Sequence, residues 1–192
     1  MSLDISAVDG WRQVLPDAAA LAHLAAGRAL YAGLGQAGVL AAVAATGARP
    51  ADSVLELGVR FDDDDAVRGL NATYRGKDRP TNVLSFPGLA PDALAEAIAW
   101  SATGGPPVLL GDLVLARGVV QAEAASQAKT VSDHALHLLV HGCLHLVGFD
   151  HMADAEAERM ETLERDIMAA LGRGDPYGPA RLAVQAEETA HG

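Results

Sequence analysis

Three histidines gather in the C-terminal third of the chain, at positions 141, 145 and 151. His141 and His145 are four residues apart, so on an α-helix their imidazoles would lie on one face, about 5–6 Å apart. Gly148 is suited to ending that helix in a left-handed turn, which would let the chain double back and present His151 from the side. Three imidazole ligands leave the fourth position of a tetrahedral ion open to water or substrate. The spacing therefore predicts a catalytic site for one divalent metal ion, with zinc as the expected ion.

The residue after the first histidine separates this pattern from that of the zinc proteases. Proteases with the spacing HExxHxxGxxH carry a glutamate there, which serves as the general base. This chain has Gly142 at that position, and glycine has no side-chain group that could accept a proton. A protease would need a base from elsewhere in the chain. Cys143 points to the opposite, apolar face of the helix, where we expect a packing residue and not a ligand.

The elements that must position the histidines can be predicted from periodicity. The histidine helix is expected over residues 132–147, with Ser132 as its N-cap. Residues 55–61 alternate between apolar and other side chains, as strands do, and 82–86 and the nearly apolar run 108–115 predict two more strands. The pattern favours an α+β or α/β fold. Helix signals predict further helices over 16–33, 62–74, 92–100, 117–129 and 154–171.

Length and composition restrict the possible classes of protein. A chain of 192 residues suits one domain with a single core, and a hydrophobic content of 50% argues against a disordered protein. One cysteine cannot form an intramolecular disulfide and fits a reducing compartment. The N-terminus has no export signal, and residues 29–48 are too weakly apolar for a convincing membrane span. We expect a cytoplasmic protein with no membrane association, with one domain over 1–178 and a flexible tail over 179–192.

The net charge of −11 argues against a nucleic-acid substrate, because proteins that bind phosphate usually carry a basic surface. The charge is unevenly distributed, however. Residues 68–82 contain four basic side chains and one acidic side chain, a local net charge of +3, whereas 150–175 contain eight acids and three arginines, a net charge of −5. A bound metal cation would add to the local positive charge. Affinity for a free polyanion is therefore expected to be weak, with a protein partner contributing the rest.

Three separate motifs and a final DPY, which occur in unbroken order along the chain, carry a resemblance to a known family. They are HGxLHxxGxDH at 141–151, NxxYRGKDxPTNVLSFP at 71–87, LGDL at 110–113 and DPY at 175–177. Together they resemble the YbeY family of metal-dependent endoribonucleases, which act in rRNA maturation, and the similarity extends over residues 53–177. Agreement among several separated motifs is more specific than a match to one motif.

The resemblance implies both a fold and an activity. It implies a compact α+β domain with a small, mostly parallel β-sheet packed with five or six helices, and a three-histidine metal site at the C-terminal end of a core helix. By position, His141, His145 and His151 match the family's metal ligands, and Arg75 matches its functionally important arginine. The implied activity is metal-dependent cleavage of single-stranded RNA, in maturation of the 16S rRNA 3′ end and in ribosome quality control. The expected partners are rRNA and ribosomal small-subunit proteins.

Two rival functions and three side-chain roles stay open at this level. The rivals are a non-enzymatic ribosome assembly factor with a structural metal, and a zinc protease. Asp112 follows a glycine in an apolar strand, where an unpaired carboxylate is costly, so we expect it to orient a ligand histidine or contact bound water. Asp150 could support the neighbouring His151, and His137 could bind RNA or line the site. For each of the three, a purely structural role is the alternative.

Overall fold

Four strands form a single sheet in the computed structural model, which describes residues 1–178. The strands are β1 (Ser2–Ala7), β2 (Leu55–Asp62), β3 (Val83–Pro87) and β4 (Val108–Ala116), and their order across the sheet is β1-β2-β4-β3. The pairs β1–β2 and β2–β4 are parallel, whereas β3 joins the edge antiparallel to β4. The predicted small, mostly parallel sheet is confirmed.

Helices make up most of the rest of residues 1–178, and there are more of them than the five or six expected. The two extra helices, α1 and α3, are only six and seven residues long, too short to show clear periodicity. β1 was also not predicted. The helices are α1 (Asp9–Val14), α2 (Ala18–Gln36), α3 (Val39–Ala45), α4 (Asp64–Arg75), α5 (Leu94–Ala102), α6 (Arg117–Ser126), α7 (Val131–Leu146) and α8 (Asp154–Ala170), with short 3-10 turns at Pro50–Asp52 and Pro91–Ala93.

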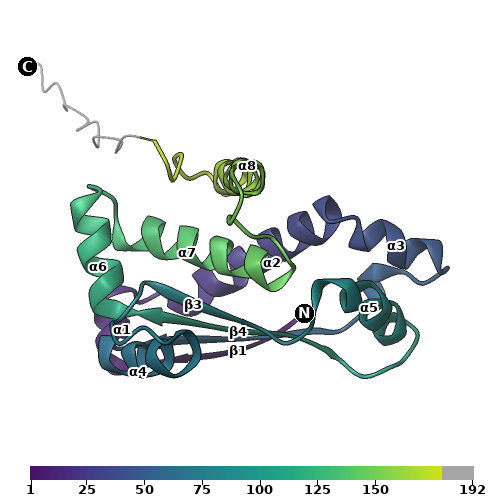
Figure 1. The fold of residues 1–192 in the computed structure, drawn as a ribbon, viewed down its shortest axis with the longest axis horizontal. Coiled ribbons are helices and arrows are strands. Elements are labelled where there is room, and N and C mark those ends of the chain that lie inside the picture. Colours follow the sequence, from purple (N-terminus) through teal and green to yellow (C-terminus); the bar gives the residue numbers. More distant parts are fainter. Residues whose placement is uncertain (179–192) are drawn as a thin grey trace, which may run out of the picture.

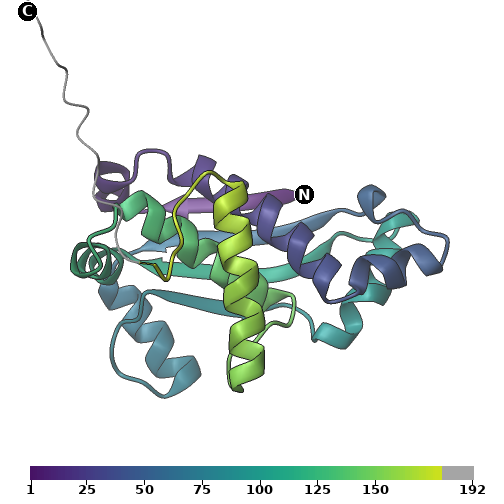
Figure 2. The same cartoon turned by 90° about the horizontal axis from the view of Figure 1, so that it is seen from above.

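The helices cover the two faces of the sheet unequally. Figure 1 shows α2 and α7 on one side of the sheet and α4 on the other, and Figure 2 shows α8 running across the strands as an outer layer above α7. The main core fills the space between the sheet and the α2–α7 pair. A smaller apolar cluster, around Val67 and Val114, lies between α4 and the opposite face. The histidine helix α7 is therefore held from both sides, by the sheet below and by α2 and α8.

Small side chains let α2 lie close to α7. Its buried face is rich in alanine, and a Cβ atom added at Gly33 would lie 2.8 Å from Cγ2 of Val147. Larger residues would push the helices apart, because interaxial distance follows the size of the side chains at the contact. The small residues of α2 thus allow close packing against the C-terminal end of α7.

Capping residues set the ends of the two helices that lead to the site. Asp63 caps α4 by accepting a hydrogen bond from the amide of Ala66, and Gly76 ends that helix with a φ of 67°, a left-handed conformation that glycine adopts easily. α7 begins one residue after Thr130, whose hydroxyl accepts from the amide of Asp133. The prediction of Ser132 as the cap is therefore wrong, because Thr130 already satisfies the helix's free amide and Ser132 lies inside the first turn.

Two predictions from the sequence concern the C-terminal tail and membrane association. The predicted tail at 179–192 lies outside the described residues. Within residues 1–178 no single helix is long and apolar enough to cross a membrane; α2 and α3, which meet at a bend of 69°, reach that length and composition only when taken together.

Candidate metal centre

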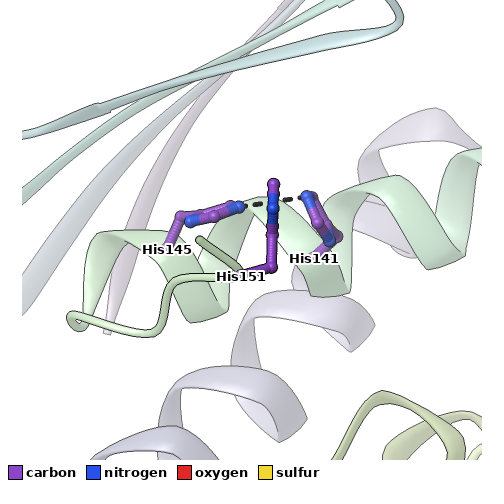
Figure 3. A group of neighbouring side chains, drawn as sticks. All are labelled: His141, His145 and His151. Atoms are coloured by element: carbon purple, nitrogen blue, oxygen red, sulfur yellow. Dashed lines mark hydrogen bonds between the residues drawn. The ribbon is translucent and has the colours of Figure 1, made fainter. Parts of the chain in front are cut away.

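The three histidines come together at the end of α7 (Figure 3). His141 and His145 lie on successive turns of the helix, which ends at Leu146. Gly148 then adopts a φ of 94°, and a Cβ there would lie 2.7 Å from Pro91, so both backbone geometry and space require glycine. The turn brings His151 back to the pair, and one nitrogen from each of the three rings lies within 4.8 Å of the others.

Hydrogen bonds fix which nitrogen of each helical histidine faces the centre. Nδ1 of His141 lies 2.7 Å from Oε1 of Glu164, and Nδ1 of His145 lies 2.9 Å from the carbonyl oxygen of Phe149. Both acceptors require Nδ1 to carry the proton, so the Nε2 lone pairs are free. The two Nε2 atoms lie 3.1 Å apart. Nitrogens held at about 2.0–2.1 Å by one tetrahedral ion would lie about 3.3 Å apart.

The donor set and its electrostatics therefore fit a metal site. Burial lowers the pKa of His145 to about 4, with further contributions from His141 and His151, so its imidazole is neutral at physiological pH. Neutral imidazole is the form that binds a metal. His141 and His145 are half-buried, while His151 is exposed, so the cluster is open to solvent on one side.

A buried carboxylate on α8 supports this centre. Glu164 is fully buried, and it accepts hydrogen bonds from Nδ1 of His141, from Nε2 of His137 at 2.9 Å and from the hydroxyl of Tyr177. Burial alone would raise the pKa of Glu164, but these three hydrogen bonds outweigh it and lower the pKa to about 2. Glu164 is therefore an ionised carboxylate in the interior. His137, for which RNA binding was one alternative, is committed to this network.

Sequence reasoning missed Glu164, although a signal was present. The apolar face of the last helix includes Met160, Leu163 and Ile167, and Glu164 follows Met160 by four residues. An acid on an apolar stripe needs partners, because a buried charge without them is costly. Its partners could not be identified from sequence, since they lie on α7 and at Tyr177.

A cavity of about 850 Å³ joins the histidines to the basic segment. Arg75, at the C-terminal end of α4, lines this cavity together with Lys77 and Arg79. The Arg75 side chain is anchored by one hydrogen bond, from Nη2 to the carbonyl oxygen of Ser85 at 3.2 Å, and the residue is exposed. The structure thus brings Arg75 into the same cavity as His141, His145 and His151.

The structure contradicts the predicted role of Asp112, whereas Asp150 does contact the neighbouring His151. Successive residues of a strand point to opposite faces. Leu113 faces α7, so Asp112 points away from the histidines; it is exposed and lines a separate cavity on the far side of the sheet. The expectation that it orients a ligand or contacts bound water is therefore wrong. Oδ1 of Asp150 accepts a hydrogen bond from the backbone amide of His151 at 2.7 Å. This bond braces the turn and does not involve the imidazole ring of His151.

Gly142, which argued against a protease, and Cys143, which was predicted to be a packing residue, both face the interior. A Cβ on Gly142 would lie 2.7 Å from Cδ2 of Leu113 and 3.2 Å from the hydroxyl oxygen of Ser85, so a glutamate has no room there. Cys143 is buried as predicted, and burial raises the pKa of its thiol to about 12. Neither residue contributes a base or a ligand.

Comparison with known proteins gives the following matches. The sequence profile of the family Endoribonuclease YbeY matches residues 37–172. A protein of Paramagnetospirillum magneticum named Endoribonuclease YbeY is 46% identical over 168 residues, which cover 88% of this chain and 90% of the relative. One of Rhodopseudomonas palustris with the same name is 54% identical over 122 residues, 64% of this chain and 61% of the relative. A solution structure from Thermotoga maritima covers 92% of this chain and 99% of its own, with 18% identity and a TM-score of 0.48.

Proposed function

The chain belongs to the YbeY family of endoribonucleases, and from this premise we propose that it is a metal-dependent endoribonuclease that cleaves single-stranded RNA. The observation that carries the proposal is the shared cavity, in which a three-histidine cluster and three basic side chains face one space. A cluster that fits a cation and a set of side chains suited to phosphate are the two parts that hydrolysis of a phosphodiester needs.

His141, His145 and His151 are the residues that would hold the cation, and we propose zinc. Three imidazole nitrogens suit zinc and similar borderline metals, whereas magnesium prefers oxygen ligands. When bound, the ion would supply Lewis-acid polarisation of a phosphoryl oxygen and lower the pKa of water. The open side of the cluster favours catalysis over a closed structural site, in which the protein supplies all four ligands.

Arg75 is proposed to bind the phosphate at which cleavage occurs. Its guanidinium offers a planar fork of donors that matches two phosphate oxygens, and it would offset charge that grows on them in the transition state. Lys77 and Arg79 would hold the flanking backbone. Glu123 and Asp150 also line the cavity, so its three basic side chains exceed the acids by one, and a bound cation would add to this positive charge.

We also propose a cellular setting. The expected role is maturation of the 16S rRNA 3′ end and ribosome quality control in the cytoplasm. α8 presents exposed acids, among them Glu156, Glu158 and Asp166, which complement a basic ribosomal small-subunit protein. Such a partner would offset weak affinity for free RNA. The scaffold alternative predicts the same contact without cleavage, and Gly142 disfavours a protease.

The test compares three substrates under identical conditions. Zinc-loaded protein is incubated with an end-labelled unpaired RNA, with the same RNA annealed to its complement, and with casein. We expect slow cleavage of the unpaired RNA only, because a rigid duplex cannot bend into the cavity. His145→Ala should abolish cleavage, whereas His23→Ala, a surface histidine on α2, should leave it unchanged. RNA cleavage that survives His145→Ala would point to a contaminating nuclease, and proteolysis lost in that variant would favour the protease.

A further inference from the structure

We propose that Glu164 is a positioning residue of the metal centre, and that Tyr177, from the segment after α8, holds Glu164 in place for that role. The inference rests on the proposed function, because it requires that His141, His145 and His151 hold a metal ion. It adds α8 and the segment 175–177 to a metal centre whose three predicted ligands all lie on α7 and in the turn after it.

The first step is the bond between Glu164 and His141. Oε1 of Glu164 lies 2.7 Å from Nδ1 of His141, on the opposite side of the ring from Nε2. A carboxylate accepts only, so the proton stays on Nδ1 and the Nε2 lone pair faces the cluster. A carboxylate behind a ligand histidine also fixes the ring orientation and makes the imidazole a stronger donor to the metal. The corresponding acceptor for His145 is a backbone carbonyl, so Glu164 is the side chain that performs this role for the helical pair.

The second step is the cost of placing a carboxylate in the interior. Glu164 is 0% exposed and lies on the apolar face of α8. If this residue only braced α8 against α7, an apolar side chain of similar size would do so without desolvating a charge. The carboxylate is instead surrounded by three donors, from His137, His141 and Tyr177. This arrangement is expected if the negative charge of Glu164 acts on the neighbouring metal ligand, His141.

The third step concerns Tyr177, the last residue of the DPY sequence, which lies just beyond the residues 37–172 that match the family profile. Its hydroxyl donates to Oε2 of Glu164, the oxygen that also bonds His137, and so leaves Oε1 for His141. The surrounding segment is anchored. The guanidinium carbon of Arg165 lies 4.8 Å from the centroid of the Tyr177 ring, Arg165 also lies 3.5 Å from Asp175, and Lys129 donates to the carbonyl of Pro176.

The experiment measures metal binding directly and needs no RNA. Zinc affinity is determined by competition with a chromophoric chelator, and the visible absorption of the cobalt-substituted protein reports the geometry around the ion. Three variants of the full chain are compared with the wild type: Glu164→Gln, Tyr177→Phe and, as a matched control, Glu158→Gln, which makes the same charge change at an exposed position of the same helix.

We expect Glu164→Gln to weaken zinc binding about 10- to 100-fold and to alter the cobalt spectrum, because an amide N–H would face one of the three donors. Tyr177→Phe should change both quantities in the same direction by a smaller factor, and Glu158→Gln should change neither. A folded Glu164→Gln variant with wild-type affinity and spectrum would overturn the proposal. If Glu164→Gln does not fold, Tyr177→Phe decides, and wild-type values in that variant would overturn it.

The same measurements separate this inference from the proposed function. If the wild type binds zinc and loses it on replacement of His141, His145 and His151 by alanine, the metal centre stands whatever Glu164→Gln does. If zinc binding survives that triple replacement, the proposed metal centre fails and the inference about Glu164 and Tyr177 fails with it.

Discussion

Arg75→Ala separates a functional role of this arginine from a structural one, because the structure limits the structural cost. Arg75 is exposed and makes one hydrogen bond, 3.2 Å long, to the carbonyl of Ser85. Because the bond is long and open to solvent, its loss should cost only about 1 kcal/mol of unfolding free energy, although its donor is charged. For a chain of this size that corresponds to a fall in Tm of about 2–4 °C. The variant should therefore fold and keep its metal.

The expected functional cost is larger. A hydrogen bond to a charged group contributes about 1.5–3 kcal/mol, which corresponds to a decrease in rate of about 10- to 150-fold if the bond to phosphate is made in the transition state. Arg75→Lys should restore only part of the rate, because an ammonium ion keeps the charge but not the planar fork of donors.

The assay combines single-turnover cleavage of a labelled, unpaired RNA with zinc content and thermal unfolding. Arg28→Ala is the matched control, since it removes one positive charge from an exposed position on α2 that does not line the cavity. The reasoning is refuted if Arg75→Ala cleaves RNA at the wild-type rate. It is equally refuted if Arg75→Ala unfolds or loses zinc, because Arg75 would then be a structural residue.

Three further predictions follow from the packing and charge of the site. Gly142→Val should lower the unfolding free energy by about 1–3 kcal/mol, because its side chain would collide with Leu113; an unchanged urea midpoint would contradict this. Burial raises the pKa of the Cys143 thiol to about 12, so at pH 8 this thiol should react with a thiol reagent at least about 100-fold more slowly in the native protein than in denaturant. Equal rates would show that the thiol is accessible in the native protein. Cleavage at subsaturating RNA should fall as salt rises, with a logarithmic slope of about −2 if Arg75, Lys77 and Arg79 contact three phosphates; a flat response would exclude an electrostatic cavity.

The part of the site that is local in sequence could be predicted from sequence. Helix geometry alone places His141 and His145 on one face, and Gly148 is the residue that a left-handed turn requires, so the return of the chain to His151 followed from spacing. The helices and strands with strong periodicity, such as β2, α4, β4 and α8, were predicted close to their observed bounds.

The parts that depend on tertiary contact could not be predicted in this way. Glu164 lies 23 residues from His141 in sequence and on another helix, and only the packing of α8 across α7 brings the two together. The role of Asp112 was predicted wrongly because a nearly apolar strand gives no sign of which face of the sheet each side chain takes. The contact between Leu113 and Gly142 turns Leu113 toward α7 and therefore Asp112 away from it. The weak, short elements β1, α1 and α3 are stabilised by neighbours more than by their own propensity.

The central claim is that one metal ion held by His141, His145 and His151 is required for RNA cleavage. The direct measurement is to strip the protein with a chelator, return zinc in steps and record cleavage of unpaired RNA against bound zinc per chain. The account predicts no cleavage by the stripped protein, a rate that rises in proportion to occupancy and levels off at one zinc per chain, and no recovery in a variant with all three histidines replaced by alanine. Full cleavage by stripped protein, or recovery in the triple variant, would contradict it.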